Sequence, residues 1–183
     1  VDLKSFDDRR YRELGGRLQP ILDTIRWLHG AGVWVEIVTL LVPGFNDSDT
    51  ELTALTEFLA GVSPDIPWHI TAFHQDYRMT DPANTTPAML IRAAEIGRRA
   101  GLRYLYAGNI PGRVGALEHT DCASCGERVI SRYGYVIQDY RLEADGSCPR
   151  CRTRLPGIWS DRFEAQRTAF PFVPHDRTRL PVI

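Results

Sequence analysis

Hydrophobic and polar positions alternate with two different periods along the first 117 residues. Short apolar runs rich in β-branched residues are typical of buried strands, and they alternate with stretches that carry apolar residues at helical spacing. The predicted strands are 1–6, 33–42, 68–73 and 102–106. The predicted helices are 20–29, 48–60 and 87–100, with a short polar helix or turn over 7–16. This order predicts an α/β fold with a parallel sheet and right-handed crossovers, either a small open sheet or part of a barrel.

The segment 40–52, LLVPGFNDSDTEL, connects one predicted strand to the next helix. The apolar run ends at Pro43-Gly44, and Ser48 and Glu51 have the spacing of a capping box. We therefore expect the Ser48 oxygen to accept a backbone N–H and the Glu51 side chain to reach back to the N-cap. The chain thus leaves the carboxyl end of a buried strand, which is the edge where parallel sheets and barrels bind ligands.

The composition changes from Thr120 onward, where two CxxC pairs enclose a β-rich segment. The pairs are Cys122/Cys125 and Cys148/Cys151, separated by 22 residues. Two such pairs can grip one tetrahedral ion, and four thiolates close its coordination sphere, so we predict a structural zinc. Iron in the same four thiolates and disulfide bonds are the alternatives.

These patterns divide the chain into three parts. The predicted boundaries are 1–117 for the β/α part, 118–157 for a four-Cys zinc ribbon, and 158–183 for a tail rich in Pro and Arg. The ribbon carries a mild excess of Arg without a compact basic stripe, which favours packing or protein docking over nucleic-acid binding.

Net charge and hydropathy narrow the range of partners. The formal net charge is −1, which argues against broad electrostatic binding of nucleic acid or membrane. No apolar run approaches the ~20 residues of a membrane span, and no signal peptide opens the chain, so we expect a cytoplasmic protein. Arg supplies 21 of the 22 basic residues, and the one lysine is Lys4. An ammonium is a compact charge that suits a tight pocket, which makes Lys4 a candidate binding residue.

Polar side chains gather near the carboxyl side of the predicted strands, and this convergence indicates a ligand site. These residues are Asp2, Lys4, Glu36, Asn46, His74 and Asn109. Structural alternatives exist: Asp2 and Lys4 could neutralise each other, and Glu36 and His74 could be ordinary core and loop residues. His69 is interpreted as structural.

Several segments together resemble a known family. DLKSF (2–6), LLVPGFNDS (40–48), WHITAFHQDYRM (68–79) and the paired CxxC module ending near PGIW resemble the second half of radical S-adenosylmethionine (SAM) enzymes of the AmmeMemoRadiSam system. The pattern is also similar to glycyl-radical activating enzymes such as pyruvate formate-lyase activating enzyme. The resemblance covers about residues 1–159.

The resemblance implies a partial (β/α)6 barrel, a [4Fe–4S] cluster and SAM as cofactors, and an oxidoreductase that cleaves SAM reductively to a 5′-deoxyadenosyl radical. It also implies that Lys4 and His74, with Asp2 beside them, hold the methionine and ribose parts of SAM. An ammonium suits a carboxylate, and an imidazole suits hydroxyl groups.

Two features depart from that pattern. The CxxxCxxC cluster motif is absent, and all four cysteines lie in the ribbon, although thiolates are the ligands of such clusters. An Arg that activating enzymes often carry before VPG is replaced by Val38-Thr39. We therefore expect a C-terminal portion whose partners are the missing N-terminal half of the barrel, SAM and an unspecified substrate, a protein among the options. This portion alone is expected to be inactive.

Two other readings stay open on the sequence. A non-enzymatic zinc-ribbon binding module on an α/β scaffold predicts that Lys4→Ala leaves small-molecule affinity unchanged. A hydrolytic or isomerising barrel enzyme would use Glu36 and His74 as its acid and base.

Overall fold

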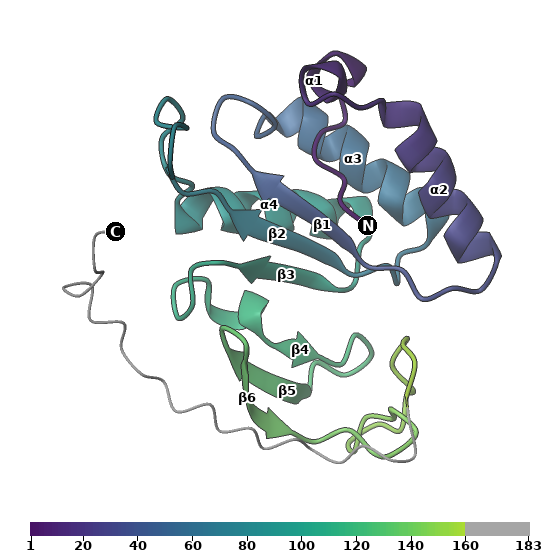
Figure 1. Cartoon of the computed structure of the whole chain (residues 1–183). Coiled ribbons are helices and arrows are strands. Elements are labelled where there is room, and N and C mark those ends of the chain that lie inside the picture. Colours follow the sequence, from purple (N-terminus) through teal and green to yellow (C-terminus); the bar gives the residue numbers. More distant parts are fainter. Residues whose placement is uncertain (160–183) are drawn as a thin grey trace, which may run out of the picture.

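A computed structural model describes residues 1–159, and the predicted 158–183 tail lies outside this range apart from its first two residues. The first part contains α1 (Asp8–Glu13), α2 (Leu18–Gly30), β1 (Ile37–Leu41), α3 (Asp49–Val62), β2 (Trp68–Ala72), α4 (Pro87–Ala100) and β3 (Leu105–Gly108). The second contains the 3₁₀ helix η1 (Gly115–Glu118), β4 (Thr120–Asp121), β5 (Arg128–Tyr133) and β6 (Val136–Tyr140). In Figure 1 the α-helices lie on one side of the first sheet and the second sheet lies below β3.

The first sheet is parallel, with strands in the order β1-β2-β3. Sequential order with right-handed crossovers places successive helices on the same face, as in the wall of a barrel. Residues on that face, such as Ile37, Trp68 and Ile70, are fully buried. The predicted fold class, a parallel β/α sheet followed by a four-Cys module, is confirmed.

The N-terminal segment extends the sheet at the β1 edge by one bridge. Asp2 pairs in parallel with Val38, but no regular strand forms over 1–6, so the predicted first strand is too long. The reason is that side chains bind the carbonyls that would continue the pairing: Leu3 O accepts from the Thr39 hydroxyl, and Leu40 O accepts from Asn46 Nδ2.

Two other strand predictions are shifted. β1 begins at Ile37 and not at residue 33, and β3 covers 105–108 and not 102–106. Leu102 N–H donates to Gly97 O at the end of α4, and Arg103 N–H donates to Pro64 O, so these residues form a connection. Apolar character marked the buried segments, whereas hydrogen bonds set where each strand starts.

The cap of α3 confirms one half of the predicted capping box. Ser48 Oγ accepts from Glu51 N–H at 3.3 Å. The second half is wrong: the Glu51 carboxylate accepts from Ser5 Oγ (2.5 Å) and Phe6 N–H (2.8 Å). Glu51 therefore ties the N-terminal segment to α3.

The second sheet is antiparallel, in the order β4-β5-β6, and it packs against β3. Tyr104 and Tyr106, beside and within β3, pack in the same hydrophobic cluster as Val129, Ile130 and Leu155 of the four-Cys module. The Tyr106 hydroxyl lies 3.0 Å from Thr120 Oγ1. Within the described residues, no helix has the length and apolar character needed to cross a membrane.

Gly97 provides a test of how closely α4 packs on the sheet. A Cβ at Gly97 would lie 2.9 Å from Leu105 Cδ2 and 3.2 Å from two Trp68 ring carbons. Gly97→Ala should lower the free energy of unfolding by about 1–3 kcal/mol in denaturant titrations, because the buried indole cannot move aside. Gly61→Ala in α3 is the matched control. Nothing lies within 4 Å of a Cβ at this position, and the free energy of unfolding should rise by up to about 1 kcal/mol. A fully stable Gly97→Ala protein would contradict this packing.

Candidate functional site

The face of the first sheet opposite the helices, here called the inner face, carries the polar residues. Strand register places Asp2, Val38, His69 and Tyr106 in one row across this face. Because side chains alternate between faces, Lys4 and Thr71 lie on the inner face one step nearer the carboxyl ends. The inner face therefore joins the segments that the sequence analysis singled out.

Asp2 and Lys4 lie together on this face. Lys4 Nζ is 3.5 Å from the Asp2 carboxylate, and the two side chains are 48% and 59% exposed. An ion pair this exposed contributes little to stability. Both side chains can therefore bind a ligand instead of each other with little loss of stability. Leu3, between them, points to the opposite face and is fully buried.

Asn46 fixes the backbone at Lys4. Its Nδ2 donates to Lys4 O (2.6 Å) and to Leu40 O (2.8 Å), and its Oδ1 accepts from Val42 N–H (2.7 Å). Asn46 is only 2% exposed, so its amide is used within the protein and not offered to a ligand. It is a positioning residue for Lys4.

His74 lies two residues beyond β2, exposed at the same carboxyl edge. The order of the segments is the N-terminal bridge, β1 and β2, so His74 lies two strand spacings across the sheet from Lys4 and about three residues further along it, a backbone separation of roughly 14 Å. Thr85 fixes this edge, because its Oγ1 donates to Leu41 O and accepts from Phe73 N–H. That these residues bind a cofactor stays a prediction.

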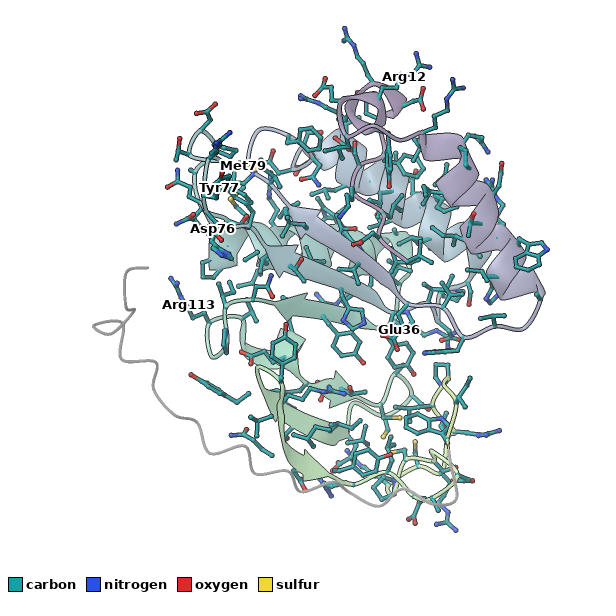
Figure 2. All side chains as sticks on the ribbon, viewed as in Figure 1. Arg12, Glu36, Asp76, Tyr77, Met79 and Arg113 are labelled. Atoms are coloured by element: carbon teal, nitrogen blue, oxygen red, sulfur yellow. The ribbon has the colours of Figure 1, made fainter. Side chains whose placement is uncertain are left out.

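The loop after His74 borders the same edge. Asp76, Tyr77 and Met79 lie on the side toward which the β1 and β2 arrows point (Figure 2). Tyr77 is 83% exposed and has a positive φ of 48°, so an aromatic ring stands in solvent next to the candidate site.

Glu36 and His69 form a pair on the amino-terminal half of the inner face. His69 Nε2 is 2.8 Å from Glu36 Oε2, and Trp34 Nε1–H donates to Glu36 Oε1 at 2.9 Å. The hydrogen bond to His69 is the main cause that lowers the pKa of Glu36. The His69 ring also stacks on Tyr106, with centroids 5.0 Å apart.

The Glu36–His69 pair corrects two interpretations made from the sequence. Glu36 precedes β1 and His74 follows β2, so about seven residues of strand, roughly 20 Å, separate them along the sheet. The acid–base pairing of Glu36 with His74 is therefore not formed. His69 is not an isolated structural histidine but the partner of Glu36, and strand alternation could have placed both on one face.

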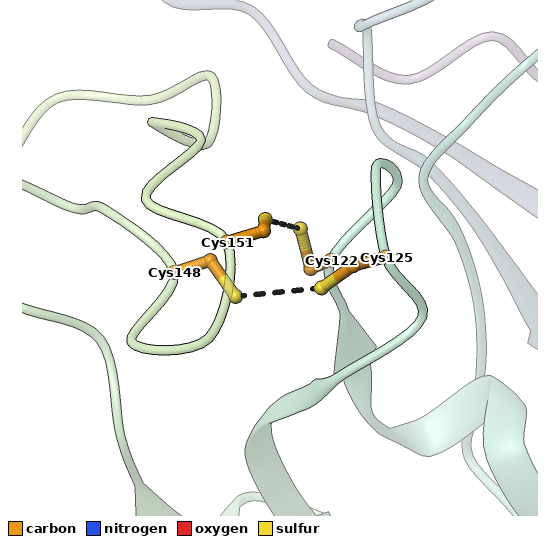
Figure 3. Close-up of side chains that lie close together, drawn as sticks. All are labelled: Cys122, Cys125, Cys148 and Cys151. Carbon is orange, nitrogen blue, oxygen red and sulfur yellow. Dashed lines mark hydrogen bonds between the residues drawn. The ribbon is translucent and has the colours of Figure 1, made fainter.

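The four cysteines form a candidate metal centre (Figure 3). Their sulfur atoms all lie within 4.8 Å of one another, with Cys122–Cys151 at 3.6 Å and Cys125–Cys148 at 3.7 Å. These distances are too long for disulfides, and a tetrahedral ion with ~2.3 Å bonds to sulfur requires sulfur–sulfur distances of about 3.8 Å. The predicted clustering of the four cysteines is confirmed, and the group could hold one metal ion.

The two CxxC pairs have matching backbones. Gly126 N–H donates to Cys122 O and Arg152 N–H donates to Cys148 O, at 2.8 and 2.9 Å. Gly126 and Arg152 are both left-handed, with φ of 74° and 65°. The two turns thus present their thiols in the same way.

Local hydrogen bonds lower the pKa of one of the four thiols. The Thr153 hydroxyl lies 3.4 Å from Cys151 Sγ, and donation from this hydroxyl and from the Thr153 N–H lowers the pKa of Cys151 to about 6. Burial raises the pKa of the Cys122 thiol. These hydrogen bonds therefore favour the thiolate form of Cys151, which is the form that binds metal.

Arg152 adopts a conformation that favours glycine, which leads to a stability prediction. Arg152→Gly should raise the free energy of unfolding by about 0.5–1 kcal/mol, because a left-handed non-glycine residue carries steric cost. Its ion pair with Glu143 is long, at 3.7 Å, and exposed, so little is lost with it. Gly126→Ala, at the matching position with open space around it, should be destabilised by about 1 kcal/mol. Thermal unfolding of the metal-loaded chain measures the stability of both variants. Two variants of equal stability would contradict the prediction.

The chain is similar in sequence to two curated proteins, to one over most of its length and to the other over about a third. The chain is 32% identical over 157 residues to the uncharacterized protein MJ0808 of Methanocaldococcus jannaschii, covering 85% of this chain and 46% of that protein. It is 40% identical over 60 residues to benzylsuccinate synthase activating enzyme of Thauera aromatica, covering 32% of this chain and 18% of that enzyme. The chain spans about half the length of the first relative and less of the second. No protein-family profile matches it.

Among solved structures, a domain of pyruvate formate-lyase activating enzyme from Bacteroides vulgatus has the same fold. The TM-score is 0.53 at 22% identity, over 60% of this chain and 65% of that one. The chain is thus distantly similar to radical SAM activating enzymes in sequence and has a β/α sheet with the fold of one of their domains.

Proposed function

We propose that the chain is the C-terminal part of a radical SAM enzyme of the activating-enzyme type. The observation that carries the proposal is that Lys4, paired with Asp2, lies on the inner face toward the carboxyl edge where His74 follows β2, in a chain similar to activating enzymes. The remainder of the intact protein would supply the other half of the barrel.

The exposed residues at this edge suit SAM chemically. The Lys4 ammonium can donate to the amino-acid carboxylate, and the Asp2 carboxylate can accept from the amino group. His74 can hydrogen-bond the ribose hydroxyls. Asn46 holds the Lys4 backbone, so the ammonium starts from a fixed point. Bound SAM would supply a sulfonium whose reductive cleavage yields a 5′-deoxyadenosyl radical.

The residues present do not fit the iron–sulfur cluster that this cleavage needs. All four cysteines of the sequence lie within one metal-binding group in the second part of the chain. Cluster ligands would therefore come from the rest of the intact protein. Substrate specificity would be determined there or by the loop near Tyr77.

For the four-Cys group we propose a structural zinc. The four sulfurs surround one position and leave no place for a fifth ligand from substrate, so the ion would stabilise the module and not catalyse. The module has a small core, which makes a metal crosslink valuable.

Lys4→Ala should weaken SAM binding. In the intact protein, loaded anaerobically with iron and sulfide, we expect at least a roughly tenfold loss of SAM affinity, because one charge-assisted hydrogen bond is removed. Calorimetry measures binding, and chromatography of 5′-deoxyadenosine formed with dithionite measures cleavage. Lys4→Arg should recover part of the affinity.

Arg98→Ala is the matched control, since Arg98 is an exposed cation in the last turn of α4, at the end of the sheet opposite the carboxyl edge. It should leave SAM affinity unchanged. An intact protein that forms no 5′-deoxyadenosine, or a Lys4→Ala variant with full affinity, would reject the proposal and favour a binding module.

Metal analysis tests the zinc proposal independently. We expect one zinc per chain, and Cys148→Ser should lower both the zinc content and the melting temperature, because one of four ligands is lost. Ser147→Ala beside it keeps all four thiols and should keep the zinc. Iron in place of zinc would overturn the assignment.

A further inference from the structure

A cavity of about 630 Å³ lies between the inner face and the four-Cys module. Its walls come from β2 and β3, from the β5–β6 hairpin and from residues 155–159. In Figure 2, Glu36 stands at the start of β1, on the side of the sheet that faces the module. The volume is that of a small-molecule site.

The lining is mostly apolar and rich in aromatic rings. Trp34, Tyr104, Tyr106, Tyr135 and Trp159 all border the cavity. The faces of such rings attract cations, and their area buries an apolar body.

The charged groups in the lining leave one carboxylate to recognise a ligand. Glu118 accepts from the backbone N–H groups of Gly112 and Gly134, and it is nearly buried. Arg132 lies over the Tyr106 ring, at 5.7 Å from the centroid, and donates to Thr120 Oγ1 at 2.8 Å. Both charged side chains therefore already have protein partners.

Glu36 is the remaining charge. Each of its oxygens has one protein donor, Trp34 Nε1–H or His69 Nε2, and can accept another. Its side chain is 46% exposed. Its two partners, Trp34 and His69, hold the carboxylate in place beside the aromatic rings.

We propose that this cavity binds a small organic cation, a primary or methylated amine on an aromatic or aliphatic body. The ammonium would bind at Glu36 and the body would pack against the aromatic lining. This proposal does not rest on SAM binding, because it is argued from Glu36 and the aromatic lining alone, and neither Lys4 nor His74 lines the cavity.

Benzylamine and benzyl alcohol test the proposal, since they differ in charge and share one apolar ring. Binding to the full chain is followed by NMR titration of the tryptophan indole N–H signals. We expect benzylamine to shift the Trp34 signal and to bind at least about tenfold tighter than the alcohol. The Trp27 signal is the internal reference, because its side chain is exposed on α2, remote from the cavity.

Glu36→Gln keeps the size of the side chain and removes its charge. It should weaken benzylamine about tenfold and leave benzyl alcohol unchanged. Asp49→Asn, on the far α3, is the matched control and should change neither ligand. The proposal is overturned if neither compound binds at millimolar concentration, if both bind equally, or if Glu36→Gln retains full amine affinity.

Discussion

The three hydrogen bonds of the Asn46 amide hold the candidate site together. They join the end of β1 to the N-terminal segment, which otherwise contributes only one bridge to the sheet. Leaving such a buried amide unpaired costs about 1–3 kcal/mol, so the arrangement of the two segments is strongly favoured. Glu51 adds a second connection from α3. The position of Lys4 thus depends on side chains of the segment that follows β1.

β3 is shared by two hydrophobic cores, and this sharing positions the second part of the chain. Leu105 and Ala107 pack toward the helices, whereas Tyr104 and Tyr106 pack with the four-Cys module. Because alternate residues of one strand serve different layers, the module covers part of the inner face and encloses a cavity there. A metal that stabilises the module would therefore also stabilise one wall of that cavity.

Two kinds of polar site lie on the same inner face at different heights along the strands. Lys4 lies toward the carboxyl ends and is loosely paired with Asp2, which is level with Val38 and His69; both side chains are exposed. Nearer the amino ends, Glu36 is held by two donors beside stacked rings. Parallel strands place their carboxyl ends at one edge, which is why sequence reasoning located the first site. The second depends on register between residues 33 apart in the chain.

The sequence by itself determined the helices, the parallel order and the four-thiol group, because period, caps and CxxC spacing are local signals. It also placed Lys4 and His74 toward the carboxyl side of their segments, whereas the register puts Asp2 level with His69. Only the tertiary structure decided that Glu51 binds Ser5 and Phe6 and not the cap, and that Glu36 pairs with His69. Those choices are made between segments far apart in sequence, and long-range hydrogen bonds of similar strength cannot be ranked before the backbone brings their partners within reach.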